Sequence, residues 1–97
     1  MKYKTLLNIA NALAEEEIDA FAKMEVAVAV NDNMDGSPYD DEGFEELCDR
    51  VYRVYLQSDK ADLSLMCYYI QQLLDDGEYE TPTIECIVRA ASEAEPY

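Results

Sequence analysis

The segment Asn31 to Glu42, NDNMDGSPYDDE, has residue types and spacing that could bind a calcium ion. Oxygen-bearing side chains stand at its first, third and fifth positions, a glycine at the sixth and a glutamate at the twelfth. This is the order of an EF-hand loop, which gathers oxygen ligands around a hard cation. In such a site Asn31, Asn33, Asp35, the Ser37 carbonyl and Glu42 would supply the ligands.

Three departures from the motif favour a simpler interpretation of this segment. Asn31 stands where an EF-hand has Asp, and Pro38 stands where a small apolar residue would donate an amide to a partner loop. No second loop of the right register is present to pair with it. The alternative is an acidic turn between two helices, whose Asn and Gly residues tolerate left-handed geometry and whose carboxylates cap the following helix. We expect the turn, with no metal and no other cofactor.

Residue types that carry catalysis are scarce in this chain. It has no histidine, so nucleophiles activated by histidine are excluded, and three glycines form no phosphate-binding loop. Cys48, Cys67 and Cys86 lack the CxxC spacing of a zinc site. They are odd in number and lie beside apolar residues, which is typical of reduced buried thiols in a cytoplasm. We expect a cytoplasmic protein that is not an enzyme.

The charge balance is the most unusual property of the sequence. Its 22 Asp and Glu against 7 Lys and Arg give a formal net charge of -15, although solubility needs a magnitude of only about 2 to 8. The excess indicates a basic partner, a cation site or a salty habitat. Direct binding to nucleic acid or to an anionic membrane is disfavoured. No apolar run approaches the roughly 20 residues of a spanning helix.

The spacing of apolar residues predicts an all-α fold, a small antiparallel bundle of four or five helices within a single domain of residues 1–97. Thr5 to Val30 reads as helical with a bend at Glu15 to Glu17. The run VAVAV, Val26 to Val30, alternates like a strand, so a short edge strand is the alternative there. The core face predicted for the second part of this segment consists of Ile18, Phe21, Met24 and Val28.

Three more helices follow the acidic segment. Ser58 or Asp59 is expected to cap the second of them, Gly77 to end it, and Thr81 to cap the last, with Pro82 in its first position. The predicted core faces of the three are, in order, Phe44, Leu47, Cys48, Val51, Val54 and Tyr55; Leu63, Met66, Ile70 and Leu73; and Ile84, Ile87, Val88 and Ala91.

The acidic residues are clustered in sequence. Asp32 to Asp49 holds eight acids and no base, and Asp75 to Glu85 holds five and no base. On a helix, residues three or four apart are spaced much like successive phosphates of a nucleic-acid strand, so such rows could occupy a groove in which another protein holds DNA or RNA. The predicted partner-binding residues are Asp32, Asp35, Tyr39, Asp40, Asp41, Glu42, Glu45, Glu46, Asp49, Asp75, Asp76, Glu78, Tyr79 and Glu80.

The tyrosines divide into two predicted groups. Tyr39 and Tyr79 stand in acidic loops, where an aromatic side chain can anchor a partner. Tyr52 and Tyr55 follow the apolar stripe of their helix, and we expect them to pack against the core.

In size, helical pattern, charge clustering and lack of catalytic residues, the whole chain resembles the small acidic inhibitors encoded by bacteriophages, including anti-CRISPR proteins and other DNA mimics. The resemblance implies blockade of a basic nucleic-acid-binding machine, such as a CRISPR effector complex, in the host cytoplasm. The chain is also similar to bacteriocin immunity proteins, with Tyr68 and Tyr69 in place of that family's tyrosine pair. A calcium-responsive helical module and a halophilic domain are the remaining alternatives, and the oligomeric state stays open.

Overall fold

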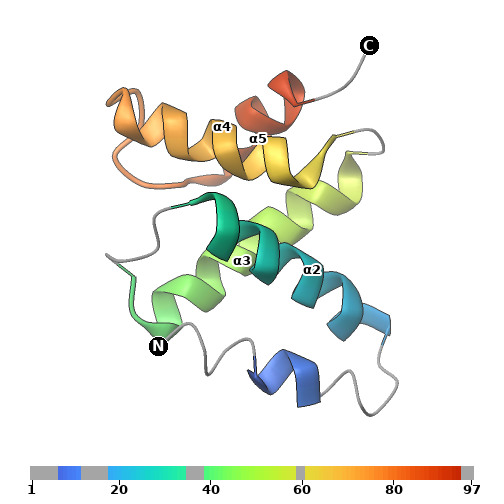
Figure 1. The fold of residues 1–97 in the computed structure, drawn as a ribbon. Helices are drawn as coiled ribbons and strands as arrows, with labels where there is room; N and C mark the ends of the chain where they lie inside the picture. Colours follow the sequence, from blue (N-terminus) through green and yellow to red (C-terminus); the bar gives the residue numbers. More distant parts are fainter. Residues whose placement is uncertain (1–6, 12–17, 35–38, 59–60, 95–97) are drawn as a thin grey trace.

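The computed structural model describes residues 7–11, 18–34, 39–58 and 61–94, and all regular secondary structure in these ranges is helical (Figure 1). Residues 7–11 form a helical segment, and four helices follow: α2 (Ile18–Asn33), α3 (Asp41–Gln57), α4 (Leu63–Asp75) and α5 (Ile84–Glu93). The all-α prediction is confirmed. The alternative of an edge strand at Val26 to Val30 is wrong, because α2 includes that run. The bend predicted at Glu15 to Glu17 lies outside the described residues.

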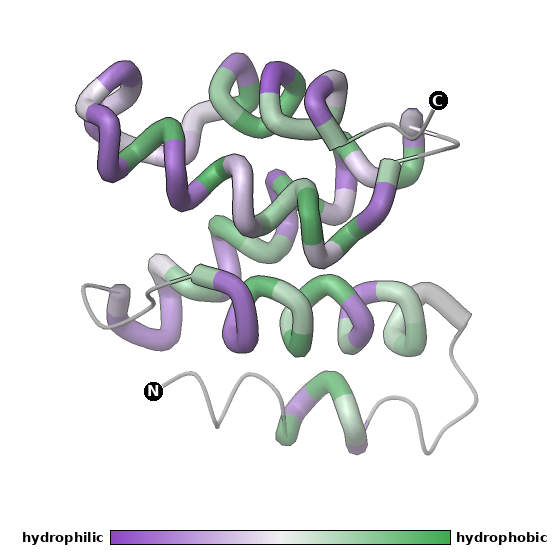
Figure 2. Tube along the Cα trace, turned by 45° about the horizontal axis from the view of Figure 1, so that its top comes forward, coloured by the Kyte–Doolittle hydropathy of each residue, from purple (hydrophilic) through white to green (hydrophobic). Residues whose placement is uncertain are grey.

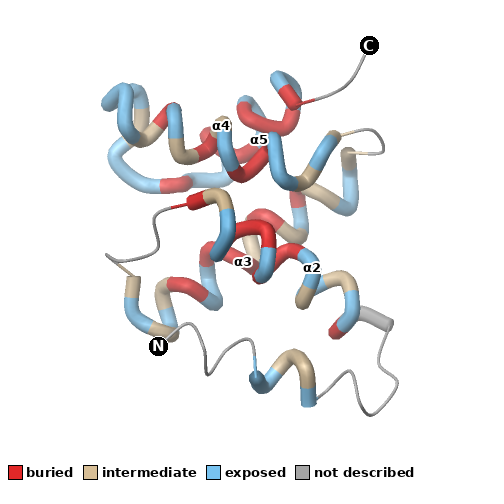
Figure 3. Tube along the Cα trace, viewed as in Figure 1, coloured by how far each residue is buried: buried red, intermediate tan, exposed pale blue. Residues whose placement is uncertain are grey.

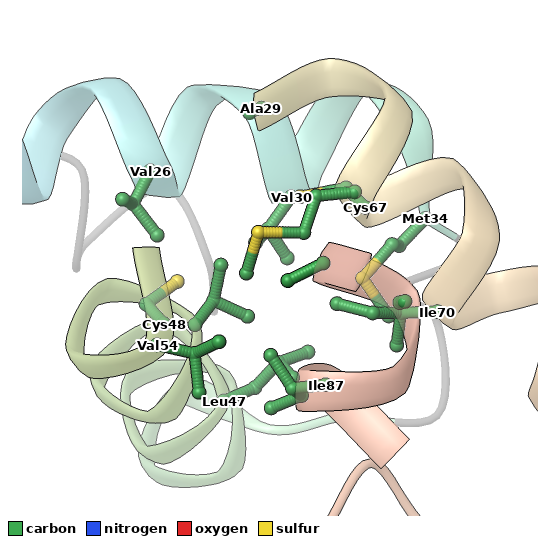
Figure 4. Close-up of a cluster of buried hydrophobic side chains, with 14 of the residues drawn as sticks. Val26, Ala29, Val30, Met34, Leu47, Cys48, Val54, Cys67, Ile70 and Ile87 are labelled. Carbon is green, nitrogen blue, oxygen red and sulfur yellow. The ribbon is translucent and has the colours of Figure 1, made fainter. Parts of the chain in front are cut away.

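The four longer helices contact one another in a closed cycle. Helix α2 packs against α3 and α4, and α5 packs against the same two helices. Their inward faces are buried, whereas their outer faces and the turn after α4 are exposed (Figure 3). Each helix contributes apolar side chains to one core, as Figure 4 shows for Val30 of α2, Leu47 of α3, Ile70 of α4 and Ile87 of α5.

The faces predicted for α3 and α4 are confirmed. Helix α3 buries Phe44, Leu47, Cys48, Val51 and Val54, and α4 buries Met66, Cys67, Ile70 and Leu73. Tyr52 and Tyr55 are half-buried and pack against the core, as expected. Both helices have one apolar stripe and one polar face, so burying the stripe leaves a single orientation open to each.

The face predicted for α2 is wrong. Phe21 and Val28 are 55% and 41% exposed, and Met24 is only half-buried. The buried residues of this helix are Ala20, Val26, Ala27, Ala29 and Val30. Helix α2 carries apolar residues around much of its circumference, as the tube coloured by hydropathy shows (Figure 2), so sequence periodicity did not define one inward face. Packing against α3 and α4 selected the face with the small alanines, which allows a close approach.

Helix α5 begins later than predicted. Its N-cap is Thr83 rather than Thr81, since the Thr83 hydroxyl accepts a 3.2 Å hydrogen bond from the Cys86 amide. Ile84 and Val88, predicted to face the core, are 47% and 48% exposed. The buried face is rotated by about one residue and consists of Cys86, Ile87, Ala90, Ala91 and Ala94.

The prediction for α4 is wrong at its N-terminal end and confirmed at its C-terminal end. Asp62, rather than Ser58 or Asp59, is its N-cap, and its carboxylate accepts a 3.0 Å hydrogen bond from the Leu65 amide. Gly77 ends the helix as predicted, with a φ of 78°. The Gly77 amide donates to the Leu74 carbonyl and the Glu78 amide to the Leu73 carbonyl, the hydrogen-bond pair of a Schellman motif. A glycine adopts this left-handed conformation without steric cost.

Candidate partner-binding groove

An open groove of about 490 Å³ lies between the first half of α3, the end of α4 and the loop that leads to α5. The beginning of α3 and the end of α4 lie on the same side of the molecule (Figure 1). The groove therefore joins the two acidic segments that are separate in sequence. Its lining residues are Tyr39, Gly43, Glu46, Leu47, Arg50, Gln71, Leu74, Asp75, Glu80, Thr81 and Pro82.

Three carboxylates from different elements border this groove. Glu46 comes from α3, Asp75 from the last turn of α4 and Glu80 from the following loop. Asp75 accepts a 2.9 Å hydrogen bond from the Gln71 side chain. Glu46 and Glu80 are exposed, and neither makes a hydrogen bond or ion pair with another described residue. Arg50 supplies the one positive charge among the lining residues.

Tyr39 forms an aromatic part of the groove wall. It is half-buried and packs against the core, so its ring position is fixed by the fold. A Cβ atom on Gly43 would lie 3.6 Å from the Tyr39 Cδ1 atom, so the glycine lies directly beside the ring. The groove is thus lined by a half-buried aromatic ring as well as by carboxylates, and Leu74 adds apolar surface beside the buried Leu47 and Pro82.

The start of α3 carries a row of exposed acids. Glu42, Glu45 and Glu46 are all exposed and are spaced by three and four residues, so they share the outer face of the helix. Asp40 is exposed and caps the helix, with its Oδ1 accepting a 2.7 Å hydrogen bond from the Gly43 amide. Asp41 is half-buried in the first turn, where a negative charge is favoured by the helix dipole. Asp40 therefore caps the following helix, as the acidic-turn interpretation predicts, and residues 35–38 of the turn lie outside the described residues.

Of the predicted residues of the first acidic segment that the structure describes, only Tyr39 and Glu46 line the groove. Asp49 lies 3.9 Å from the Lys23 ammonium and 3.5 Å from the Arg53 guanidinium, so its charge is compensated within the protein. Asp32 is exposed on the last turn of α2 and does not line the groove. Asp35 lies outside the described residues.

The second acidic segment is partly committed to internal contacts. Glu78 forms a 3.1 Å ion pair with Arg89 of α5. The pKa of Arg89 is raised, first by a hydrogen bond with Tyr79 and then by the charge of Glu78. Tyr79 is half-buried and packs against the core, and Asp76 is the C-cap of α4. Glu78 and Tyr79 therefore connect the loop to α5, and of the acids in this segment only Asp75 and Glu80 line the groove.

The structure changes the boundaries of the calcium-like segment. Helix α2 continues through Asn33, so the loop predicted to begin at Asn31 begins later. The Asn33 side-chain amide donates a 2.9 Å hydrogen bond to the Ala29 carbonyl, an interaction within the helix. Among the described residues, no three His, Cys, Asp or Glu side chains lie close enough together to hold a metal ion.

Several groove residues were not predicted from the sequence. Arg50 follows Glu46 by four positions and Gln71 precedes Asp75 by four, so each shares a helix face with a predicted acid. This spacing is a signal that could have found them. Leu74 and Pro82 carry no such signal, because an apolar residue at these positions is equally typical of the core.

The cysteines are unsuited to nucleophilic chemistry. Burial raises the pKa of the Cys48 and Cys67 thiols to about 12, and burial also raises the pKa of Cys86. Since the thiolate is the nucleophile, these protonated thiols are unreactive near neutral pH.

Within the described part of the chain, no helix has the length and apolar character needed to cross a membrane. Comparison with known proteins finds no matching family model, no matching curated protein and no matching solved structure.

Proposed function

We propose that this chain is a non-catalytic acidic inhibitor. It binds a basic nucleic-acid-binding protein, such as a CRISPR effector complex, and occupies the site of its DNA or RNA by charge mimicry. The observation that carries the proposal is the groove in which Glu46 of the first acidic segment meets Asp75 and Glu80 of the second. Two segments some thirty residues apart in sequence thus contribute carboxylates to one groove.

The physical basis of the proposal is electrostatic complementarity. The net charge of -15 attracts a basic partner at long range and raises the association rate, most strongly at low salt. The row of Glu42, Glu45 and Glu46 presents negative charges at intervals of about 5 to 6 Å along a rigid helix. A partner that holds phosphates with Lys and Arg side chains would bind this row through the same side chains.

The test is capture of the partner from a bacterial lysate, followed by competition between this chain and labelled DNA or RNA for that partner. Mutual exclusion is expected. If the chain and the nucleic acid bind the partner together without weakening each other, the proposal is wrong.

A matched pair of variants distinguishes binding through the acidic row from attraction by the net charge of the whole protein. Glu42→Gln, Glu45→Gln and Glu46→Gln together remove three charges from the acidic row, and we expect slower association with a weaker dependence on salt. The control carries three neutralised glutamates elsewhere on the exposed surface: Glu25→Gln, Glu85→Gln and Glu93→Gln. If both triple variants associate equally slowly, net charge rather than the acidic row drives binding.

A bacteriocin-type immunity protein is the second candidate, and the aromatic pair on α4 favours it. Tyr68 is 47% exposed and meets Tyr69 edge-on, with ring centroids 5.7 Å apart. This candidate predicts that the captured partner is a toxin nuclease and that Tyr68→Ala speeds dissociation from it, because aromatic residues are frequent interface anchors.

A further inference from the structure

We infer that the groove receives one arginine side chain of the basic partner. In this arrangement the guanidinium meets the carboxylates of Glu46 and Glu80, and the aliphatic part of the arginine lies on the apolar floor. The inference rests on the proposed function and deepens it, because it names the chemical group that the partner must present and the place that it occupies.

The carboxylates of the groove are available to a cationic ligand. Glu46 and Glu80 are exposed and make no ion pair or hydrogen bond within the described part of the molecule, whereas Asp75 already accepts from Gln71. The lining holds three carboxylates against the single guanidinium of Arg50, a net charge of -2. The negative net charge of the lining therefore attracts a cationic side chain into the groove, and the positive charge of Arg50 disfavours the entry of a second one.

The floor of the groove suits a long amphipathic side chain better than a metal ion. Leu47, Leu74 and Pro82 line the groove, and because Leu47 and Pro82 are buried, the half-buried Leu74 and Tyr39 offer most of its apolar surface. Arginine and lysine place their methylene chains on such surface while the charged end meets polar groups. The groove volume of about 490 Å³ accommodates a whole side chain, and no described cluster of acids is tight enough for a metal ion.

Tyr39 favours arginine over lysine. A guanidinium is planar, so it can stack on an aromatic ring and pair with a carboxylate through two parallel hydrogen bonds. An ammonium is a compact point charge and lacks this geometry. The Tyr39 ring is held beside Gly43 and against the core, so it is already in place before a ligand enters. The Tyr39 side chain itself then loses little conformational freedom on binding.

The experiment uses the full isotope-labelled chain and two capped peptides of equal length, tri-arginine and tri-lysine, in an NMR titration. We expect tighter binding of tri-arginine, with the largest shifts at the Gly43 amide and the Gln71 side chain. Glu46→Gln with Glu80→Gln should weaken tri-arginine binding about tenfold. The control pair, Glu25→Gln with Glu93→Gln, neutralises two exposed acids outside both the groove and the acidic row and should weaken it less than about threefold.

A second variant tests the aromatic contact. Tyr39→Leu keeps an apolar side chain and should reduce the preference for arginine over lysine, with folding checked by the dispersion of the spectrum. Equal weakening by both glutamate pairs, or equal binding of the two peptides, would overturn the groove inference. The peptide titration tests only the groove inference. The proposed function is tested separately, by whether this chain and nucleic acid exclude each other from the captured partner.

Discussion

The Oδ1 atom of Asp40 lies 2.7 Å from the backbone nitrogen of Gly43 and accepts its hydrogen bond. A Cβ atom added to Gly43 would lie 3.1 Å from the same oxygen, so a larger residue at this position would require the Asp40 side chain to shift by a few tenths of an ångström. The cap fixes the first turn of α3 and thereby the position of Tyr39 and Glu46 in the groove. Asp40 therefore has a structural role that is separate from its charge.

Replacing Asp40 distinguishes these two roles. Asp40→Ala removes the acceptor and should lower the free energy of unfolding by about 1 kcal/mol, the usual cost of a lost N-cap. Asp40→Asn keeps an acceptor and removes the charge, so its stability should stay close to that of the unmodified protein. Urea unfolding followed by circular dichroism measures both. An equal loss for the two variants would contradict the capping role.

Core and surface positions that look alike in sequence should respond differently to truncation. Ile70 is fully buried, so Ile70→Ala should cost about 2 to 5 kcal/mol through lost burial and the cavity left behind. Phe21 is 55% exposed, and Phe21→Ala should cost less than about 1 kcal/mol. Chemical denaturation compares them. A loss at Phe21 as large as that at Ile70 would show that the face of α2 is assigned wrongly.

The buried thiols predict a loss of stability at alkaline pH. The pKa of Cys48 and Cys67 is about 12 in the folded protein, against a reference value of 9.0. Between these values the unfolded chain has released the thiol protons and the folded chain has kept them, so the free energy of unfolding falls as pH rises. Each thiol contributes at most about 1.4 kcal/mol per pH unit. Cys67→Ala should make this decline shallower.

Thiol labelling provides an independent check of the same burial. At pH 8 a disulfide reagent should react slowly with the native protein and quickly with all three cysteines in denaturant, since the thiolate is the reactive form. Rapid labelling of Cys48 or Cys67 in the native protein would contradict their burial.

Calcium should not stabilise this protein specifically. Millimolar calcium is expected to raise Tm no more than magnesium does. Both ions screen the negative charge of the protein equally, and only an ion that binds a specific site of the folded state would add further stability. Differential scanning calorimetry of the unmodified chain and of Glu42→Gln gives the comparison. A calcium-specific rise of several degrees that is absent in Glu42→Gln would restore the EF-hand interpretation.

Sequence periodicity predicted the fold where a helix has one apolar stripe. The faces of α3 and α4 agree with the pattern because most residues on the rest of each circumference are polar, with Leu56 and Leu65 as exposed exceptions. It failed for α2, where Phe21 and Ala27 are both apolar and only the neighbouring helices decide which is buried. It failed at Thr81 because Thr83 offers the same capping hydroxyl two residues later.

The site was predictable only in part. Charge clustering identified Glu46, Asp75 and Glu80, but their meeting in one groove depends on how α3 and α4 are placed relative to each other. The sequence also contains no sign that Asp49 pairs with Lys23, since the two residues lie on different helices. Of the acids selected by local composition, some therefore line the groove, some pair with basic residues of the protein and others, such as Glu42 and Glu45, are exposed outside the groove.

The closed cycle of contacts among α2, α3, α5 and α4 has a consequence for the way this protein opens. Each helix is held by two neighbours, so none can detach without breaking two interfaces and exposing the shared core. Detaching any one helix should therefore cost a large part of the free energy of global unfolding, and we expect the four helices to open largely together. Slow hydrogen exchange should then be shared by the buried amides of all four helices rather than confined to one hairpin.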